Sequence, residues 1–262
     1  MKTVLYDTIG GNYNATRRAD PYIADRIYQL LNANPAGLYM DIGCGTGNYL
    51  NALTNKGLRF YGIDPSDTML QAARLKNTDT TFIKSKAEDI SLQSNFFDGA
   101  TAVLTLHHWE NQLKGLQEVN RVLKPGAKIV FFSFTPEQMR GYWLYHYFPE
   151  MIEAATKLIP STEEMTQLLK ESGYGSVETE LYFVQEDLQD HFMYSNKHKP
   201  ANYLSAEVRN NASAFSALAT KEEVEHGLII LESDIKSGEI THIMQEYEND
   251  LGDYLFITAI KP

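Results

Sequence analysis

Residues 39–50 read YMDIGCGTGNYL and place three glycines within five positions, directly after an apolar run. Glycines that follow a strand let the chain turn sharply, and they let backbone N–H groups approach a ligand where any Cβ would collide. Gly43, Gly45 and Gly47 lead into a predicted helix from about Thr46 to Thr54. This order puts the turn at the sheet edge where nucleotide-like ligands bind in parallel α/β folds.

The spacing of the glycines narrows the choice of ligand. It is G-x-G-x-G, whereas the dinucleotide fingerprint is G-x-G-x-x-G and a phosphate-binding P-loop needs Gly-Lys-Ser/Thr. Taken alone, the turn is equally compatible with a tight connection that binds nothing. Asp64 ends the next predicted strand, 17 residues beyond Gly47, where an acidic side chain can accept both hydroxyl protons of a ribose. The two features together predict a ribose-containing ligand.

Short β-rich runs alternate with helical stretches through the first 140 residues, which is typical of a parallel sheet covered on both faces. Asp20-Pro21 predicts a helix N-cap and a proline at the first helical position, with the helix continuing to about Leu31. A helix within Asn111–Leu123 is stopped by Lys124-Pro125-Gly126. The predicted strands are Leu38–Ile42, Arg59–Ile63, Thr81–Lys84, Asp98–Thr105, Ala127–Phe134, Ser176–Val184 and Gly252–Ile260. The pattern predicts a doubly wound α/β fold.

The region before the last predicted strand has a different character. About 65 residues separate the last two predicted strands, and they include helical segments at Ala212–Leu218 and Glu222–Ile235. A structureless loop of that length inside a compact domain would be unusual. We therefore predict a core formed by residues 1–185 and 251–262, with residues 186–250 inserted as a helical cap.

Several classes of protein are disfavoured by composition. The single cysteine, Cys44, cannot form an internal disulfide, and the adjacent His107 and His108 do not make a zinc site without further ligands, so we expect no metal. Met1–Asn14 lacks the apolar stretch of a signal peptide, and no run approaches the roughly 20 apolar residues of a membrane span. We expect a soluble cytoplasmic protein that does not bind membranes.

The net charge of −11 comes from the second half of the chain. Residues 1–140 carry 15 Lys and Arg against 13 Asp and Glu, whereas residues 141–262 carry 8 against 21. Such a surface repels phosphate backbones, and no basic stripe with interleaved aromatics is present, so we expect no nucleic-acid partner.

Further motifs follow the glycine turn in a fixed order. They are Asp41-Ile42-Gly43-Cys44-Gly45-Thr46-Gly47, Gly62-Ile63-Asp64-Pro65-Ser66 with Met69, Ala87-Glu88-Asp89, Phe97-Asp98, Leu106-His107-His108-Trp109, and Arg121-Val122-Leu123-Lys124-Pro125-Gly126. From about Tyr6 to Phe134 the chain resembles the class I S-adenosylmethionine-dependent methyltransferases, and is most similar to their small-molecule subgroup called type 11. The resemblance implies a Rossmann-like, seven-stranded, mostly parallel sheet.

The resemblance also implies roles for individual residues. The glycine turn and Asp41 would hold the amino-acid end of S-adenosyl-L-methionine, Asp64 the ribose hydroxyls, and Pro65 with Ala87-Glu88 the adenine. The full set implied to bind the cofactor, or its product S-adenosyl-L-homocysteine, is Tyr13, Arg18, Asp41, Gly43, Cys44, Gly45, Gly47, Asp64, Pro65, Met69, Ala87, Glu88 and Thr105. Relatives often carry an acid where this chain has Lys86, so the adenine contact falls either to Glu88 or to the main chain.

The first 20 residues resemble the short leader that relatives fold over the cofactor. Tyr13 and an arginine at 17 or 18 are the candidates in it, because a guanidinium can pair with the cofactor carboxylate in a fork. A solvated charge beside a packed helix is the alternative for these arginines.

Substrate and catalytic candidates lie elsewhere. Methyl transfer from a sulfonium needs an aligned nucleophile and a dry pocket more than acid–base groups. The aromatic stretch after the fifth strand supplies Tyr142, Trp143, Tyr145 and His146 as substrate candidates, although one face of that stretch is expected to be core.

A general base is needed only for some nucleophiles. For an alcohol or phenol, His107 or His108 could accept the proton, and apolar alternation along the fourth strand favours His108. We predict a methyltransferase acting on a small molecule under a helical or aromatic lid. A protein or RNA methyltransferase and a non-catalytic cofactor-binding scaffold are the alternatives.

Overall fold

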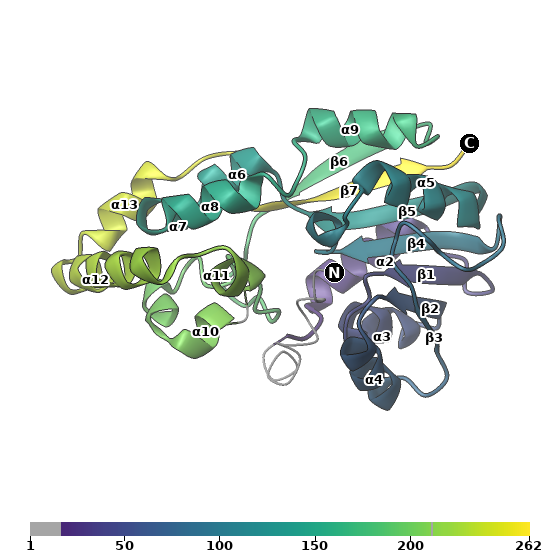
Figure 1. Cartoon of the computed structure of the whole chain (residues 1–262), viewed down its shortest axis with the longest axis horizontal. Helices are drawn as coiled ribbons and strands as arrows, with labels where there is room; N and C mark the ends of the chain where they lie inside the picture. The colour runs from purple at the N-terminus through teal and green to yellow at the C-terminus, as the bar shows by residue number, and fades with distance from the viewer. Residues whose placement is uncertain (1–16, 211) are drawn as a thin grey trace. The chain divides into compact units, whose positions relative to one another are not determined.

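The computed structural model describes residues 17–210 and 212–262. Among them, seven strands form one sheet in the order β3-β2-β1-β4-β5-β7-β6 (Figure 1). The strands are β1 Leu38–Ile42, β2 Arg59–Asp64, β3 Thr81–Lys84, β4 Phe97–Val103, β5 Leu123–Ser133, β6 Val177–Tyr182 and β7 Tyr254–Ile260. β1 pairs in parallel with β2 and β4, β2 with β3, and β4 with β5, while β7 runs antiparallel to β5. The predicted mostly parallel, doubly wound sheet is confirmed.

The middle of the sheet is buried on both faces. Ile129 to Phe132 of β5 are all inaccessible to solvent, as expected of a strand that helices cover on both sides. The rings of Phe132 and Phe256 lie 5.0 Å apart across the β5–β7 pair. Because parallel strands share one direction, the carboxyl ends of β1, β2 and β4 meet at one edge, where the predicted site residues follow.

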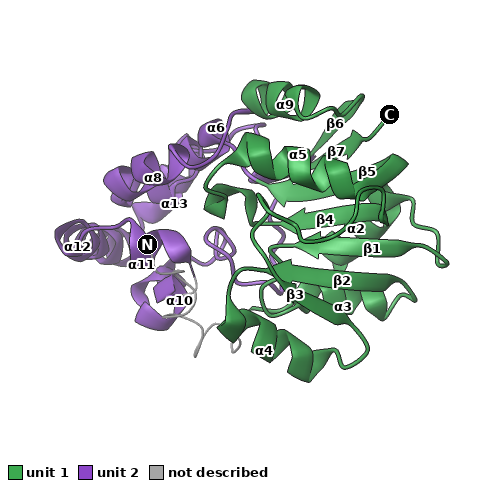
Figure 2. Cartoon of the chain, turned by 45° about the vertical axis from the view of Figure 1, so that its right-hand side comes forward, with its two compact units in different colours: residues 1–133, 162–180, 255–262 green, residues 134–161, 181–254 purple. Residues whose placement is uncertain are grey.

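The chain divides into two compact units (Figure 2). Unit 1 comprises residues 1–133, 162–180 and 255–262, and unit 2 comprises residues 134–161 and 181–254. Unit 2 therefore contains residues 134–161 in addition to the segment predicted to form a cap.

In unit 1 the helices surround the sheet. They are α2 Pro21–Leu31, α3 Asn48–Thr54, α4 Asp67–Lys76, η1 Leu106–His108, α5 Gln112–Val122 and α9 Thr162–Glu171. The predicted start of α2 is confirmed: Oδ1 of Asp20 accepts a hydrogen bond from Ile23 N at 3.1 Å, and Pro21 occupies the first turn. Asn32 ends this helix in the left-handed conformation, with φ 47°, a conformation that asparagine tolerates better than most residues.

Unit 2 is mainly helical. Its helices are α6 Pro136–Arg140, α7 Leu144–Tyr147, α8 Pro149–Thr156, η2 Pro200–Leu204, α10 Ala206–Asn210, α11 Ser213–Ala217, α12 Lys221–Ser237 and α13 Ile240–Glu246. The carboxylate of Glu223 accepts from Met151 N at 2.9 and 3.1 Å, which ties α12 to the first turn of α8. A Cβ at Gly227 would lie 2.4 Å from the carbonyl oxygen of Tyr147, so glycine permits the close approach of α12 to α7.

Within the part of the chain that the structure describes, none of the helices is both long and apolar enough to span a lipid bilayer.

Candidate cofactor and active site

The turn after β1 is fixed against β2 and against the segment that follows β4. The N–H groups of Gly43 and Cys44 both donate to the carbonyl oxygen of Ile63, at 2.7 and 3.0 Å. Gly43 has φ +70°, and a Cβ there would lie 1.9 Å from Oγ1 of Thr105, which is itself buried. A side chain at Gly43 would be both strained and in collision, so only glycine fits.

Gly45 differs from Gly43 in its surroundings. Its φ is +52°, but a Cβ there would meet no atom of the described residues within 4 Å. Its N–H donates to Oδ2 of Asp64 at 2.9 Å. No described residue therefore covers the main chain at Gly45 beside this buried carboxylate, where a polar ligand can approach closely. These features fit the cofactor implied by the sequence.

Asp64 is the last residue of β2 and is only 8% exposed. Besides the bond from Gly45, its Oδ1 accepts from Ser66 N at 2.8 Å. The two backbone donors fix the carboxylate beside the glycine turn, and a preorganised group loses less entropy when a ligand binds. Pro65 is half-buried and Met69 is buried in the first turn of α4, where Ser66 Oγ accepts from Met69 N at 3.3 Å.

Asp41 is a second buried carboxylate at this edge, 3% exposed. Its Oδ1 accepts a hydrogen bond from Oγ1 of Thr101, directly opposite on β4, at 2.7 Å. Burial raises the pKa of Asp41 to about 7; the bond from Thr101 opposes this shift, and the negative charge of Asp64 adds to it. A cation bound nearby would stabilise the ionised form of Asp41 and so offset the cost of its burial.

Glu88, in the loop after β3, connects this loop to the start of α5. Oε1 of Glu88 accepts from Asn111 N at 3.0 Å, just before α5 begins. Ala87 is buried beside Gly115, where a Cβ on that glycine would lie 3.3 Å from the Cβ of Ala87. Lys86, which replaces the acid of many relatives, forms an exposed ion pair with Glu110 at 2.7 Å. Glu88 thus has a structural bond, and its contact with adenine stays a prediction.

The fourth strand ends earlier than the sequence predicts. β4 stops at Val103 rather than Thr105, because Leu104 adopts a left-handed φ of 50° and a 3₁₀ turn follows over Leu106–His108. The alternation used to favour His108 over His107 therefore does not extend to these residues, and that argument was wrong. Which histidine faces a substrate stays a prediction.

The two histidine rings lie in contact in a tilted arrangement, and the pKa of each is lowered. Their ring centroids lie 3.9 Å apart at 48°. Desolvation lowers the pKa of His107 well below its ordinary value, with contributions from His108 and from the positive charge of Arg17. Desolvation also lowers the pKa of His108 to about 4, and Arg17 acts in the same direction. Both imidazoles are neutral at pH 7.

Other predicted cofactor residues are placed as follows. Gly47 forms the N-cap of α3 with φ 75°. The thiol of Cys44 is buried, which raises its pKa well above the ordinary value. Arg18 is exposed just before α2. Tyr13 lies outside the described residues.

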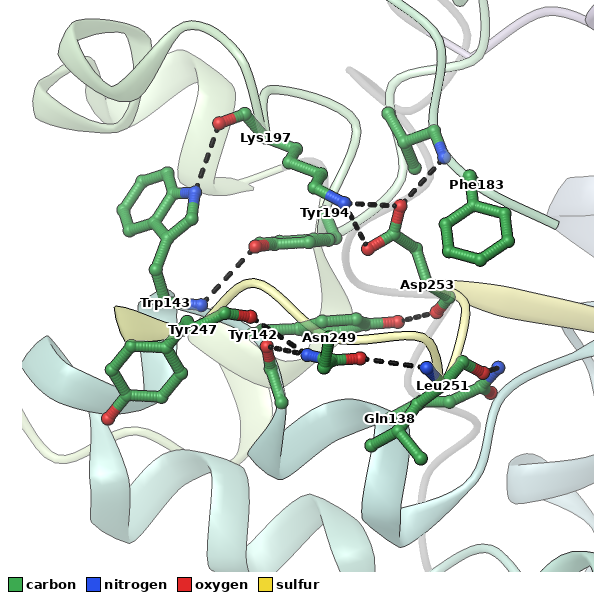
Figure 3. Close-up of polar contacts among 12 residues, drawn as sticks. Gln138, Tyr142, Trp143, Phe183, Tyr194, Lys197, Tyr247, Asn249, Leu251 and Asp253 are labelled. Atoms are coloured by element: carbon green, nitrogen blue, oxygen red, sulfur yellow. Dashed lines mark hydrogen bonds and ion pairs between the residues drawn. The ribbon is translucent and has the colours of Figure 1, made fainter. Parts of the chain in front are cut away.

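Two predicted substrate residues lie in the aromatic core of unit 2 (Figure 3). The ring of Tyr142 stacks on that of Tyr194 at 3.8 Å and 13°. The rings of Trp143 and Tyr203 are T-shaped, with centroids 5.4 Å apart. Nε1 of Trp143 donates to the carbonyl oxygen of Lys197 at 3.0 Å, as Figure 3 shows. Both residues are 1% exposed, so both pack as core side chains.

The other two predicted substrate residues lie closer to the surface of unit 2. Tyr145 is half-buried and its hydroxyl donates to Glu153 at 3.1 Å. His146 is exposed, and its ring meets Tyr147 edge-on at 4.9 Å and Tyr247 at 6.5 Å.

Sequence reasoning missed three polar residues beside the glycine turn. Thr101 holds Asp41, while Asn48 and Lys76 bond to each other at 2.8 Å. A hydroxyl in the second half of the fourth strand, among small apolar residues from position 99 to 103, was a signal for Thr101. Asn48 and Lys76 lie 28 positions apart, and nothing in their local sequence shows that they meet.

Known proteins match this chain over the region that carries the motifs and beyond it. The sequence profile of a family described as "Methyltransferase domain" matches residues 40–131. A crystal structure from Anabaena variabilis, described as a methyltransferase of an antibiotic biosynthesis pathway, is 33% identical, covers 93% of this chain and 98% of its own, and superposes with a TM-score of 0.83.

Two curated relatives have different substrates in their names. A demethylmenaquinone methyltransferase of Clavibacter sepedonicus is 28% identical over 65% of this chain and 74% of its own length. A tRNA (carboxymethyluridine(34)-5-O)-methyltransferase, ALKBH8 of Macaca fascicularis, is 30% identical over 51% of this chain. The match spans 20% of the length of the tRNA enzyme.

Proposed function

Because the chain belongs to the class I S-adenosylmethionine-dependent methyltransferases, we propose that it methylates a small molecule in the cytoplasm. The match to a demethylmenaquinone methyltransferase over 74% of that enzyme supports a small-molecule substrate. The net charge of −11 opposes binding to a phosphate backbone. The observation that carries the cofactor site is the open space at Gly45 beside the fixed carboxylate of Asp64.

We propose that the cofactor is held by the residues that the sequence implied. Asp64 would accept the ribose hydroxyls, and Asp41 with the glycine turn would hold the amino-acid end. When bound, the cofactor supplies an electrophilic methyl group on a positively charged sulfur. The residues of this chain bind and orient it, and the buried position of Asp41 and Asp64 strengthens their attraction for positive charge.

For the reaction itself, we propose that one of the neutral imidazoles, His108 or His107, accepts a proton from the nucleophile. A pKa of about 4 leaves His108 free of a proton at neutral pH, but it also makes the imidazole a weak base. The same positive charge of Arg17 that lowers the pKa of both imidazoles would lower the pKa of a hydroxyl placed beside them. The site therefore suits an acidic hydroxyl or an enolic carbon better than an alkyl alcohol.

On the substrate side, we propose that residues 186–250 act as a cap that selects the substrate. Tyr145 and His146 are better candidates for a direct contact than Tyr142 and Trp143, because the latter two are already packed in the core of unit 2.

Calorimetric titration with S-adenosylhomocysteine tests the cofactor site. Asp64→Asn removes the negative charge but keeps the shape of the side chain, and hydrogen bonds to a charged acceptor contribute about 1.5–3 kcal/mol. We expect affinity to fall by about one to two orders of magnitude. Asp67→Asn is the matched control, since Asp67 lies exposed on α4 and pairs with Lys84. Equal affinity in wild type and Asp64→Asn would remove Asp64 from the site.

The substrate class is tested by methyl transfer from the radiolabelled cofactor to fractions of a cell extract. Label in the organic-soluble small-molecule fraction is the expected result. Label confined to the RNA fraction would favour the RNA alternative that the tRNA methyltransferase match suggests, and would overturn the small-molecule proposal.

A further inference from the structure

One side-chain amide joins three parts of unit 1. Asn48, the first residue of α3, donates from Nδ2 to the carbonyl oxygen of Arg17 at 2.8 Å and accepts at Oδ1 from Lys76 Nζ at 2.8 Å. Lys76 Nζ also donates to Oγ1 of Thr46, inside the glycine turn, at 3.2 Å. An ammonium can only donate and a carbonyl can only accept, so the partners fix the orientation of the amide.

The next residue of α3 holds the same segment. The hydroxyl oxygen of Tyr49 accepts from Asp20 N at 3.5 Å, and both residues are nearly buried. Asp20 is in turn the N-cap of α2. The first turn of α3 therefore contacts the stretch 17–20 at both of its ends.

The stretch 17–20 includes Arg17, whose positive charge affects the two histidines of the proposed catalytic pair. The positive charge of Arg17 lowers the pKa of both His107 and His108. Its main chain is bonded to Asn48, whose neighbour in the sequence, Gly47, is part of the turn that would hold the cofactor.

We propose that Asn48, oriented by Lys76, is a positioning residue that couples occupancy of the glycine turn to the placement of the main chain at Arg17. The proposal rests on the cofactor site proposed above. A ligand that orders the turn stabilises the Asn48 bond to Arg17, and by linkage the bonded Arg17 raises the affinity of the turn for the ligand.

Two variants separate the contacts of Asn48. Asn48→Asp keeps an acceptor for Lys76 but has no donor for the Arg17 carbonyl, whereas Asn48→Ala loses both. Asn51→Ala, one turn later on α3 and half-buried, is the matched control. For a hydrogen bond of ordinary strength we expect both Asn48 variants to bind S-adenosylhomocysteine about five- to tenfold more weakly, with Asn51→Ala unchanged.

Tryptic cleavage after Arg17 and Arg18, followed by mass spectrometry, reports the coupling directly. We expect S-adenosylhomocysteine to slow this cleavage about tenfold in wild type and in Asn51→Ala, and less than about twofold in Asn48→Asp at saturating ligand. Circular dichroism checks that each variant is folded. Equal protection in wild type and Asn48→Asp would overturn the inference while leaving the cofactor site intact. Failure of wild type to bind the ligand would instead overturn the proposed function.

Discussion

The ion pair between Asp253 and Lys197 should be a main support of unit 2, and removing one partner tests this. Nζ of Lys197 lies 2.8 and 2.9 Å from the two carboxylate oxygens of Asp253, and the two side chains point toward one another in Figure 3. Oδ2 of Asp253 also accepts from Val184 N at 2.7 Å, and its main-chain oxygen accepts from the hydroxyl of Tyr142. The perturbation is Asp253→Asn, which preserves shape and an acceptor for Val184.

The expected cost follows from burial. The side chain of Asp253 is 6% exposed and that of Lys197 is 28% exposed. Breaking a fully buried pair costs about 3–5 kcal/mol because one charge stays buried without its partner, so with Lys197 partly in water we expect about 2–3 kcal/mol. The exposed pair Lys221–Glu225, at 82% and 64% exposure, is the control, and Glu225→Gln should cost less than about 0.5 kcal/mol.

Urea unfolding measures both variants. The chain has two tryptophans, Trp109 in unit 1 and Trp143 in unit 2, so a Trp109→Phe background leaves Trp143 as the fluorescent reporter of unit 2. The double variant Asp253→Asn/Lys197→Met should recover at least about 1 kcal/mol relative to the sum of the single changes, since no unpaired charge remains. If Asp253→Asn costs no more than Glu225→Gln, the reasoning is refuted.

Three further predictions concern the candidate cofactor site at the carboxyl end of β1. In the folded protein the carboxyl of Asp41 keeps its proton up to about pH 7, whereas in the unfolded chain it loses the proton near pH 4. The contribution of Asp41 to the free energy of unfolding is therefore full below about pH 4 and declines by about 1.4 kcal/mol per pH unit until about pH 7. Asp41→Asn should flatten this part of a curve of unfolding free energy against pH. Gly43→Ala should prevent folding or lower the melting temperature sharply, because its Cβ would meet Thr105, and a melting temperature like that of wild type would contradict the packing. Gly45→Ala should cost only the backbone strain of about 1–2 kcal/mol yet weaken S-adenosylhomocysteine binding by more than tenfold, as calorimetry would show; unchanged affinity would mean that no ligand approaches Gly45.

Much of the fold could be predicted because its signals are local. The strands at Leu38–Ile42 and Thr81–Lys84 have the predicted bounds, since each is a short apolar or β-branched run between turn residues. β5 begins at Leu123, four residues earlier than predicted, because Leu123 pairs with Phe97 before the register shifts. The turn that Lys124-Pro125-Gly126 indicated is present as an irregularity within β5, because the pairing with β4 jumps from Leu123 to Lys128 and Gly126 has a φ of 80°.

The parts of the candidate site that could be predicted are those that the backbone conformation determines. Gly43 and Asp64 stand out because a strand followed by a positive-φ turn has few acceptable residues. The partners of Asn48 and the packing of Tyr142 depend on contacts between distant segments. Aromatic side chains are equally suited to a core and to a substrate pocket, so composition alone could not separate Tyr142 and Trp143 from Tyr145 and His146.

The acidity of Asp41 gives an independent reason to regard this edge as functional. A carboxylate whose pKa is raised to about 7 by burial makes the folded protein less stable at neutral pH than a neutral side chain of the same shape would. Thr101 donates to one of its oxygens, whereas the negative charge of Asp64 raises its pKa further. Asp64 has a role in the fold, since it accepts from the N–H groups of Gly45 and Ser66, but the burial of Asp41 costs stability at neutral pH. We propose that a positively charged ligand offsets this cost, because a nearby cation stabilises an ionised carboxylate, and S-adenosylmethionine carries positive charge on both its sulfonium and its amino group.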